Sequence, residues 1–422
     1  MTSFAAVILA AGKGMRMLSD LPKALQPLCG EPLLSYVLGT VEALGAKKIV
    51  VVAGYKFDRV REAVGRRAQL VRQKQLLGSG HAVAQAEAAL AGFKGPVLVM
   101  YCDTPLVSAA TVGRLADNHR ERATDCTLLS VEAERPAGYG RIKRNPDGSV
   151  ARIVEETDAD AVEKKIREIN VGCYVFNKEG LFAALKVVRR NPNKKEYYLT
   201  DVVEILSRTG RVEAVRTADA DEVAGVNTRL ELAVLEERAQ QRILQRWIAR
   251  GVRIRDPRST TIDAGVEIGH DTVIFPHTVI EQGSKIGKNC QIGPFARIRG
   301  ASRIEDGAVI GNFVEIVRSR IGRGTQVKHL SYIGDAEIGA GVNVGAGTIT
   351  ANYDGKKKHK TVIKDKAQIG SGTVLVAPVI IGRSAKTGAG SVVTKGKNVP
   401  DRGIVVGVPA KRLSVNSKAM TK

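Results

Sequence analysis

A strict six-residue spacing of isoleucine runs through the second half of the chain and constrains its fold more than any other feature. Ten isoleucines follow one another at this spacing, and a small or β-branched residue stands two positions before each of them. A unit of six residues accommodates one short strand and one turn, so three units close a triangular coil with the large side chain pointing inward. Glycine often follows the isoleucine, where the backbone must turn. The ten positions are Ile262, Ile268, Ile274, Ile280, Ile286, Ile292, Ile298, Ile304, Ile310 and Ile316.

The repeat continues, after one-residue slips, almost to the end of the chain. Residues Tyr353–Lys360 interrupt it, and we expect them to form a loop that projects from the coil, a place where function often resides. Because chance does not place so many identical residues in phase, we predict a parallel β-helix from about Ile262 to about Val393. The later repeat positions are Ile321, Val327, Ile333, Ile338, Val344, Ile369, Leu375 and Ile381.

The chain before residue 228 follows another pattern, in which short apolar runs alternate with helical stretches. This alternation predicts an α/β domain with a mostly parallel sheet. Apolar residues at helical spacing then predict one long linking helix over Thr228–Arg250, ended by Gly251. We therefore expect three parts, residues 1–227, 228–251 and 252–422. The predicted strands are Ala5–Ala10, Lys48–Ala53, Pro96–Met100, Cys126–Val131 and Val171–Phe176, and the predicted helices include Leu33–Leu44 and His81–Ala91.

The composition suits these predictions and favours a cytoplasmic protein. Apolar residues make up 44% of the 422 residues, which supports sizeable cores, whereas aromatic residues make up only 4% and glycine is plentiful, as in repetitive β structure. The five cysteines are scattered without a CxxC pair, which is typical of reduced thiols. The apolar N-terminus lacks a basic region and predicts a buried first strand rather than a signal peptide. No run approaches the length of a membrane span.

The chain carries a formal net charge of +22, and residues 353–422 hold 15 Lys and Arg against 3 Asp and Glu. A nucleic-acid partner would explain such an excess. Phosphorylated small molecules explain it equally well, and part of it is expected to be ordinary solvated surface. Because the sequence has no aromatic-interleaved basic patch, zinc finger or RNP-type motif, we expect no nucleic-acid partner.

A glycine-rich turn, Leu9–Met17, follows the first predicted strand directly. Glycines let the backbone approach an anion closely, and free N–H groups together with Arg16 can cradle phosphates. Lys23 would lie nearby as a point charge. A tight strand–helix connection explains such a turn equally well, so the motifs that follow it decide between the two.

Those motifs follow in order along the first half. Gln73 with Leu77–His81, Val99–Leu106 and the further segments below resemble the signature of the sugar-nucleotidyltransferases, which join a sugar 1-phosphate to a nucleoside triphosphate and release pyrophosphate. In this resemblance Gln73 and its neighbours recognise the base, and Val99–Leu106 is the strand end that carries the metal-binding aspartate, Asp103. The further segments are Tyr139–Arg141, Ile153–Glu155, Glu168–Gly172, Glu196–Asp201 and Gly225–Asn227.

Four motifs in the second half lie in one frame: Ile292–Arg297, Gly311–Glu315, His329–Glu337 and Asn343–Gly355. They resemble the acetyltransferase half of bacterial bifunctional enzymes, the UDP-N-acetylglucosamine pyrophosphorylase / glucosamine-1-phosphate N-acetyltransferases. The likeness covers the chain from about residue 4 to about residue 410, in the same domain order. It implies a Rossmann-like first domain, a left-handed β-helix and a homotrimer with acetyl sites between neighbouring β-helices. It also implies acetyl transfer from acetyl-CoA to glucosamine 1-phosphate, then uridylyl transfer from UTP, supplying peptidoglycan and lipopolysaccharide synthesis.

The resemblance implies roles for individual residues of the first half. Backbone at Leu9–Gly12 and the Lys23 side chain hold the UTP phosphates, and Arg16 stabilises the charge that develops on them. Asp103 and Asn227 hold Mg²⁺ while the sugar phosphate oxygen attacks the α-phosphorus in line, without a protein nucleophile. The residues implied at the UTP and UDP-N-acetylglucosamine site are Leu9, Ala10, Ala11, Gly12, Lys23, Gln73, Gly78, Ser79, Tyr101, Asp103, Gly140, Glu155, Asn170 and Asn227, with Gln73, Gly78 and Ser79 at uracil and Gly140, Glu155 and Asn170 at the sugar.

In the second half the resemblance makes His329 the general base. It takes a proton from the amine of glucosamine 1-phosphate as that amine attacks acetyl-CoA, a task that suits histidine. An isolated histidine is more often an ordinary surface or core residue, and the surrounding motif His329–Tyr332 is what favours the base. The implied sugar-phosphate contacts are Arg299, Tyr332, Asn343, Asn352 and Tyr353, and the implied acetyl-CoA contacts are Ala346, Ser371 and Ala389.

The sequence also departs from the family pattern. Met15 stands where threonine is usual, and Cys102 stands where glycine precedes the aspartate. Val317 stands where a lysine contacts the sugar phosphate. Arg318, the next residue, is a candidate substitute for that lysine, although it would point to the other side of the strand. Gly407 stands where an arginine contacts CoA in some members. The β-helix is expected to be about two turns shorter than usual.

Two alternatives to the bifunctional enzyme remain. The departures favour a monofunctional nucleotidyltransferase with another sugar or nucleotide, whose β-helix serves assembly. Some translation-initiation exchange-factor subunits share the two-part architecture and act as interaction scaffolds, but such a protein would tolerate the loss of phosphate and metal ligands. The joint presence of Lys23, Asp103, Asn227 and His329 favours the enzyme.

Overall fold

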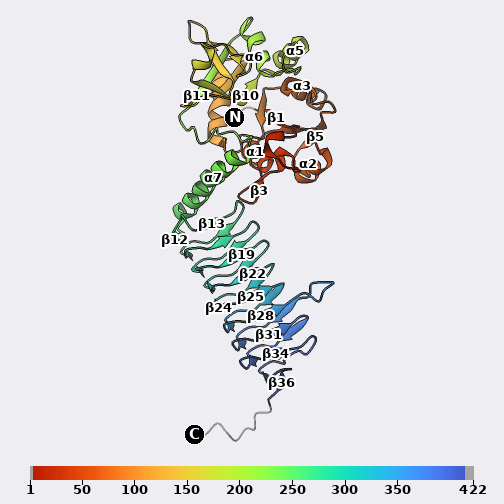
Figure 1. The fold of residues 1–422 in the computed structure, drawn as a ribbon, viewed down its shortest axis with the longest axis vertical. Coiled ribbons are helices and arrows are strands. Elements are labelled where there is room, and N and C mark those ends of the chain that lie inside the picture. The colour runs from red at the N-terminus through yellow and green to blue at the C-terminus, as the bar shows by residue number, and fades with distance from the viewer. Residues whose placement is uncertain (1–2, 414–422) are drawn as a thin grey trace. The chain divides into compact units, whose positions relative to one another are not determined.

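The computed structural model describes residues 3–413, and the chain divides into two compact units between Arg238 and Ala239. The division falls inside helix α7 (Arg229–Ala249), which matches the predicted linking helix (Figure 1). No helix among the described residues is both long enough and apolar enough to cross a membrane.

The N-terminal unit is built on one twisted, mostly parallel sheet, as predicted. Its central strand β1 is apolar throughout because both of its faces are buried: Ala5, Val7 and Leu9 enter one core and Ala6, Ile8 and Ala10 enter the other. Only β10 runs antiparallel to its two neighbours along the main strand order, and a hairpin of β8 (Arg141–Arg144) and β9 (Val150–Val154) extends from it. The main order is β11 (Val212–Thr217), β7 (Cys126–Glu132), β10 (Glu168–Phe176), β6 (Val97–Tyr101), β1 (Ala5–Ala10), β4 (Lys48–Ala53) and β5 (Gln69–Arg72).

Helices supply the apolar side chains that complete both cores. Two of them begin at side-chain caps: the hydroxyl of Ser108 accepts the Thr111 N–H, and the amide of Asn177 accepts the Glu179 N–H. The predicted helix over His81–Ala91 is wrong in extent, because the α-helix there ends at Ala84 and a separate 3₁₀ turn covers Ala88–Leu90. The helices are α1 (Leu33–Ala43), α2 (Phe57–Val64), α3 (Ser79–Ala84), α4 (Ala109–Glu121), α5 (Lys178–Val187) and α6 (Thr200–Ser207).

The C-terminal unit contains the predicted parallel β-helix, formed by strands of two to four residues that stack into three sheets. Within residues 3–413, one sheet has ten strands from β12 (Arg253–Ile254) to β36 (Lys411–Arg412). A second has eight from β13 (Thr261–Ile262) to β34 (Val392–Val393), and a third has seven from β14 (Glu267–Ile268) to β32 (Val379–Ile381). From β12 to β34 consecutive strands alternate among the three sheets and pair in parallel with strands of the neighbouring coils, so three consecutive strands make one turn (Figure 1). At the end, β35 (Ile404–Val406) and β36 pair antiparallel.

The phased isoleucines form the interior of this coil. Ile262, Ile280, Ile298 and Ile316 are register partners along one sheet, and all ten predicted positions are buried. Threonine takes the inward position in two later strands, Thr350 in β28 (Ile349–Ala351) and Thr387 in β33 (Lys386–Thr387), and Ile349 beside Thr350 is exposed. The hydroxyl of Thr350 accepts the Gly334 N–H at 2.7 Å, which satisfies that buried donor just before the chain leaves the coil.

The interruption at residues 353–360 is a loop, as predicted, lying between β28 (Ile349–Ala351) and β29 (Thr361–Ile363). Asp354 organises it by accepting the backbone N–H groups of Lys356 and Lys357 and contacting the ring of His359. These bonds hold the pKa of Asp354 well below its usual range. The loop is therefore ordered by its own polar groups.

Candidate active sites

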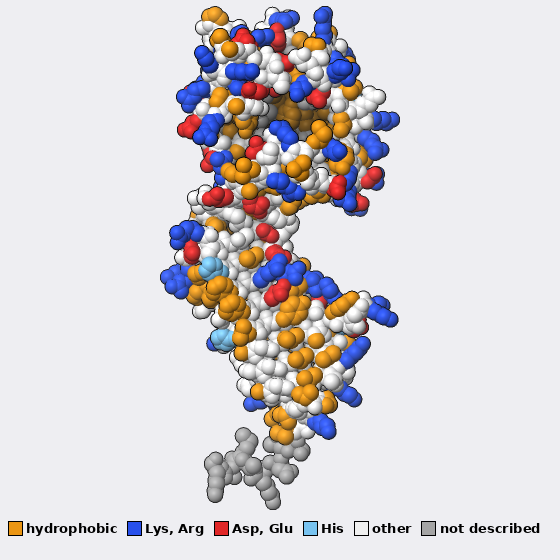
Figure 2. All heavy atoms as spheres, viewed as in Figure 1, with side chains coloured by type: hydrophobic (Ala, Val, Ile, Leu, Met, Phe, Trp, Pro, Cys, Tyr) orange, Lys and Arg blue, Asp and Glu red, His pale blue; other side chains and the backbone are white. Residues whose placement is uncertain are grey.

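A cavity of about 250 Å³ opens at the carboxyl ends of β1 and β6 in the N-terminal unit, the edge of a parallel sheet where ligands commonly bind. Figure 2 shows a hollow with hydrophobic side chains in it, in the region where Figure 1 places β1 and α3. Its lining brings together most of the predicted nucleotide residues. It consists of Leu9, Ala11, Gly12, Lys23, Gln73, Leu76, Gly78, Ser79, Ala82, Tyr101, Cys102, Asp103 and Glu196.

Lys23 is the charged centre of this cavity. Its ammonium lies 2.6 Å from Oδ2 of Asp103 and 2.9 Å from Oδ1 of Asn227. Asp103 follows β6 and Asn227 precedes α7, so the fold joins positions that are 80 and 204 residues from Lys23. Gly14 has φ 69°, and a Cβ there would lie 2.8 Å from Lys23 Cβ, so only glycine lets the turn pack this closely on the lysine.

The segment predicted to recognise the base is held by a hydrogen bond within it and by contacts with Tyr197 and Leu199. Gln73 is buried, and its amide donates to the Gly78 carbonyl at 3.0 Å. Gly78 has φ 100°, and a Cβ there would lie 2.6 Å from the carbonyl oxygen of Tyr197. The Ser79 hydroxyl accepts the Leu199 N–H at 3.0 Å. The predicted residues thus lie together beside a backbone that only glycine permits.

The predicted sugar residues converge near the hairpin. A Cβ on Gly140 would lie 3.6 Å from Oε2 of Glu155 and 3.7 Å from Cβ of Asn170. Glu155 accepts a hydrogen bond from the Thr200 hydroxyl at 2.9 Å, and burial raises the pKa of its carboxyl group. Asn170 lies at a register shift of β10 and donates to the Tyr174 hydroxyl at 2.7 Å.

Six predicted residues do not line this cavity: Gly140, Glu155 and Asn170 near the hairpin, Asn227 beside Lys23, and also Arg16 and Ala10. Arg16 is exposed in a 3₁₀ turn, Met15–Met17, and Ala10 is buried in the core of β1. Met15 is also exposed, so this departure from the family pattern does not line the cavity. Cys102 does line it, and burial raises the pKa of its thiol to about 12, which keeps it protonated.

The second candidate centre lies on the β-helix. His329 is exposed at the end of β24 (Gln326–His329), in register with Asn312 at the end of β21 (Val309–Asn312). The Asn312 amide oxygen lies 3.0 Å from Nδ1 of His329. With this oxygen facing the ring, Nδ1 carries the hydrogen and donates it, which leaves Nε2 as the proton acceptor.

The predicted acetyl-CoA residues stack beside the histidine. Gly347, Gly372 and Gly390 occupy successive coils, and their N–H groups donate to the carbonyls of His329, Ala346 and Ser371, respectively. Ala346, Ser371 and Ala389 therefore form one column at the corner where His329 lies. Asn343 is exposed on β27 (Asn343–Val344), the strand that pairs with β24.

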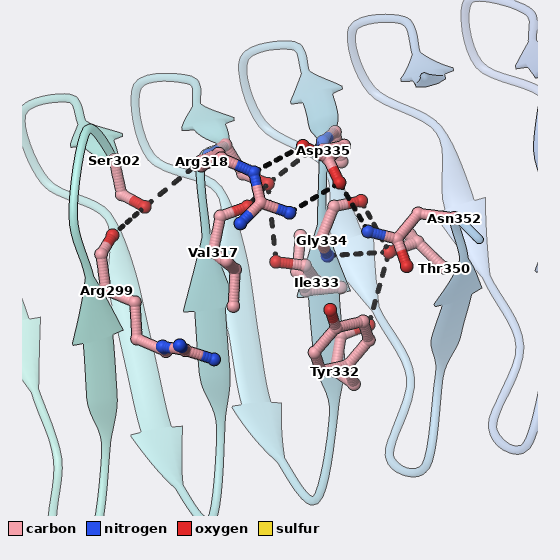
Figure 3. A network of polar contacts seen from close by, with 12 residues as sticks. Arg299, Ser302, Val317, Arg318, Tyr332, Ile333, Gly334, Asp335, Thr350 and Asn352 are labelled. Carbon is pink, nitrogen blue, oxygen red and sulfur yellow. Dashed lines mark hydrogen bonds and ion pairs between the residues drawn. The ribbon is translucent and has the colours of Figure 1, made fainter. Parts of the chain in front are cut away.

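Two of the predicted sugar-phosphate contacts, Tyr332 and Asn352, lie together at Gly334 (Figure 3). A Cβ on Gly334 would lie 2.7 Å from both the Tyr332 hydroxyl and the Asn352 side-chain nitrogen, so these two side chains meet above the glycine. Arg299 and Val317 precede Gly334 in register along β19 (Arg297–Arg299), β22 (Glu315–Val317) and β25 (Tyr332–Gly334). Arg299 donates to Glu315 at 3.1 Å.

Tyr353 does not lie with Tyr332 and Asn352 at Gly334, and Gly407 has no side chain that could contact CoA. The Tyr353 hydroxyl donates to the Gly355 carbonyl within the loop, and its side chain is exposed. Gly407 has φ 90°, a conformation that an arginine at this position would adopt only with strain. The glycine at 407 is therefore a backbone requirement of this chain.

Comparisons with known proteins support the predicted family for both halves of the chain. The family model of the MobA-like NTP transferase domain matches residues 6–249, and that of the bacterial transferase hexapeptide (six repeats) matches residues 283–318. The bifunctional protein GlmU of Pelotomaculum thermopropionicum is 48% identical, covering 89% of this chain and 90% of the relative. The chain belongs to the bifunctional GlmU family.

Other GlmU proteins extend the likeness. Those of Halalkalibacterium halodurans and Geobacillus thermodenitrificans are each 43% identical and cover 92% and 95% of this chain, and 93% and 95% of their own lengths. Membership of the GlmU family confirms the predicted enzyme, with a nucleotidyltransferase domain and a hexapeptide-repeat acetyltransferase domain.

Sequence reasoning missed three residues of these sites in this GlmU family member. Thr200 contacts Glu155, Asn312 contacts His329, and Asp335 contacts Asn352. Each lies inside a segment that carried the resemblance, but the segment alone does not say which side chains meet. Among the described residues no three His, Cys, Asp or Glu side chains form a metal cluster.

Proposed function

We propose that this member of the GlmU family makes UDP-N-acetylglucosamine in two steps. The His329 centre acetylates glucosamine 1-phosphate, and the Lys23 centre then joins the product to the uridylyl group of UTP. The observation that carries the proposal is that each half of a chain from a bifunctional family builds its own centre, around Lys23 with Asp103 and Asn227 in one and around His329 with Asn312 in the other.

In the uridylyl step the protein acts through position and charge. The backbone at Leu9–Gly12 ends β1 at the cavity and faces the phosphates of UTP. The Lys23 ammonium offsets negative charge while a phosphate oxygen of N-acetylglucosamine 1-phosphate attacks the α-phosphorus and pyrophosphate leaves. Glu155 and Asn170 hold the sugar, and Gln73 with Ser79 holds the uracil.

The residues of the cavity also fit Mg²⁺. Oxygens of Asp103 and Asn227 already converge on one cation, the Lys23 ammonium, at 2.6 and 2.9 Å. One or two protein oxygens completed by substrate phosphates is the usual magnesium arrangement. These two side chains would hold the ion, which supplies further neutralisation of phosphate charge.

In the acetyl step Nε2 of His329 takes a proton from the amine of glucosamine 1-phosphate. The amine attacks the carbonyl carbon of acetyl-CoA, and the CoA thiolate leaves. Arg299 holds the sugar phosphate, and Tyr332, Asn343 and Asn352 orient the sugar. The corner column of Ala346, Ser371 and Ala389 carries the CoA.

We further propose a homotrimer that works in the cytoplasm, with acetyl sites between neighbouring β-helices. Phe295, Phe313 and Leu330 support this assembly, because they are 47%, 56% and 63% exposed on successive coils of the corner that carries His329. The rings of Phe295 and Phe313 stack with centroids 5.0 Å apart. The five cysteines are all buried and include no CxxC pair, which supports a reducing compartment.

Two assays on one preparation test the proposal. Acetyl-CoA with glucosamine 1-phosphate should release CoA, and UTP with N-acetylglucosamine 1-phosphate should release pyrophosphate. His329→Ala should abolish CoA release and leave pyrophosphate release unchanged. His270→Ala, at an exposed histidine of another coil, should leave both activities unchanged. Loss of both activities in His329→Ala would contradict separate centres.

A second candidate function is a monofunctional nucleotidyltransferase, which Val317 favours because its side chain offers no charge to a sugar phosphate. In that case pyrophosphate release would be robust and no CoA release would be detected. The same pair of assays separates the two functions.

A further inference from the structure

Asp335 links two residues of the β-helix, one from the coil before its own and one from the coil after it. Arg318 donates to it with both Nε and Nη2, at 2.7 Å to Oδ1 and 2.7 Å to Oδ2 (Figure 3). The Asn352 side-chain nitrogen donates to the same Oδ2. One carboxylate therefore joins an arginine of one coil to a predicted substrate residue of another.

This carboxylate determines which way the Asn352 amide faces. The hydrogen bond from Arg318, and then that from Asn352, lower the pKa of Asp335, so the group is ionised and can only accept hydrogen bonds. Asn352 must turn its NH₂ group toward Asp335, and its oxygen then faces the opposite way. Arg318 contributes a planar, two-point contact that fixes the carboxylate itself.

The oxygen of Asn352 is available for a ligand. Among residues 3–413 no side chain or backbone N–H donates to it, although Asn352 is buried to 93% of its surface. The Asn352 amide lies above Gly334 beside the Tyr332 hydroxyl, at the end of the row formed by Arg299 and Val317. An acceptor oxygen there suits the N–H of an amino sugar.

Arg318 does not replace the missing lysine of position 317. Val317 lies in the row between Arg299 and Gly334 and is only 3% exposed. Arg318 follows it with φ 47°, at the corner where the chain turns, and its guanidinium is engaged by Asp335 on the side away from Arg299 (Figure 3). Its charge is therefore neutralised before any phosphate arrives.

We infer that Arg318 and Asp335 are positioning residues, which hold the Asn352 amide with its oxygen toward the amino group of the acceptor sugar. The inference rests on the proposed acetyl transfer at His329. Neither residue touches the substrate, and both act through Asn352. The site thus selects an acceptor that presents an N–H donor at this point.

Steady-state kinetics of CoA release, with pyrophosphate release measured on the same samples, test the inference. Arg318→Ala should lower kcat/KM for glucosamine 1-phosphate about tenfold, the loss of one well-placed charge-assisted contact, and should leave the KM for acetyl-CoA unchanged. Arg318→Lys, which keeps one hydrogen bond, should recover part of the loss. Because the Arg318 side chain is 38% exposed, its truncation leaves no buried cavity.

The deciding variant is the double substitution. Asn352→Ala should itself lower kcat/KM, and Arg318→Ala should then change it by less than twofold in the Asn352→Ala background. Arg320→Ala is the matched control, since Arg320 makes a similar ion pair with Glu305 on another sheet and should leave kcat/KM unchanged.

Two results would overturn the inference while leaving the proposed function intact: an undiminished effect of Arg318→Ala in the Asn352→Ala background, or equal effects of Arg318→Ala and Arg320→Ala. A wild-type protein that releases no CoA would overturn the proposed acetyl transfer and the inference with it.

Discussion

At the scale of single residues, burial and charge set what each side chain of the two sites can do. Glu155, a predicted sugar contact, and Asp201 of α6 both have carboxyl groups whose pKa is raised. For Asp201 the pKa is raised to about 6, by burial first and then by the carboxylates of Glu204, Glu155 and Asp158. Burial and the neighbouring carboxylates therefore disfavour the charged form of these two acids.

Asp201→Asn should stabilise the protein at neutral pH. A carboxyl whose pKa is higher in the folded chain than in the unfolded chain favours folding below the unfolded value, and this contribution is lost as pH rises through about 6. We expect the variant to melt at a higher temperature than wild type at pH 7.5 and at the same temperature near pH 4. Calorimetry at both pH values checks this.

Asp58→Asn, at an exposed position on α2, is the control and should show no such pH-dependent difference. A stabilisation of Asp201→Asn that is equal at pH 4 and pH 7.5 would contradict the assigned cause.

Val317→Lys should strengthen the binding of the acceptor phosphate. The new ammonium would extend from the row between Arg299 and Gly334, on the substrate side of the coil. A charge-assisted contact with phosphate is expected to lower the KM for glucosamine 1-phosphate by roughly tenfold. Val279→Lys, an exposed position of the same sheet, should leave the KM unchanged, and an unchanged KM in Val317→Lys would mean that the phosphate lies elsewhere.

At the scale of elements, the β-helix is held by apolar side chains that stack in register from coil to coil. Ile298 pairs with Ile280 and Ile316 along one sheet and is fully buried. Thr350 takes an inward position, although the sequence pattern would assign that position to the neighbouring isoleucine, Ile349. The Thr350 hydroxyl accepts the Gly334 N–H, so a polar residue inside the coil holds the backbone beneath Tyr332 and Asn352.

Ile298→Ala should lower the free energy of unfolding of the β-helix by about 2–5 kcal/mol, because it removes a buried side chain and leaves a cavity. Ile380→Ala, at a position 39% exposed on another sheet, should lower it by less than 1 kcal/mol, on the order of surface substitutions. Thermal unfolding followed by circular dichroism measures both. Equal losses would mean that the interior is not close-packed at Ile298.

At the scale of the whole molecule, each candidate centre is built within a single unit of the chain. The cavity around Lys23 uses residues up to Asn227, and the His329 centre uses residues beyond Ala239. The two reactions of the proposed function therefore do not share a catalytic group.

Lys23→Ala should reduce pyrophosphate release by a hundredfold or more, on the order of losing a charged group that stabilises the transition state. CoA release from the same sample should stay at the wild-type rate. Lys47→Ala, an exposed lysine of the same unit, should affect neither activity. A parallel fall of both activities in Lys23→Ala would show that the centres depend on each other.

Much of this molecule follows from local patterns in its sequence. The period of six determines the β-helix, because stacked coils need a large side chain at the same place in each unit, and β1, β4 and the long helix α7 lie within a residue of their expected limits. The glycine-rich turn after β1 also lines the cavity around Lys23, through Leu9, Ala11 and Gly12.

Only the tertiary structure decided which distant side chains meet. Lys23 donates hydrogen bonds to Asp103 and Asn227. Asn312 contacts the ring of His329, and Arg318 donates to Asp335. The physical reason is that such contacts depend on the register between strands and on the direction in which each side chain leaves the backbone. Spacing along the chain specifies which face a residue occupies, but the packing of one coil or strand on the next selects its partner.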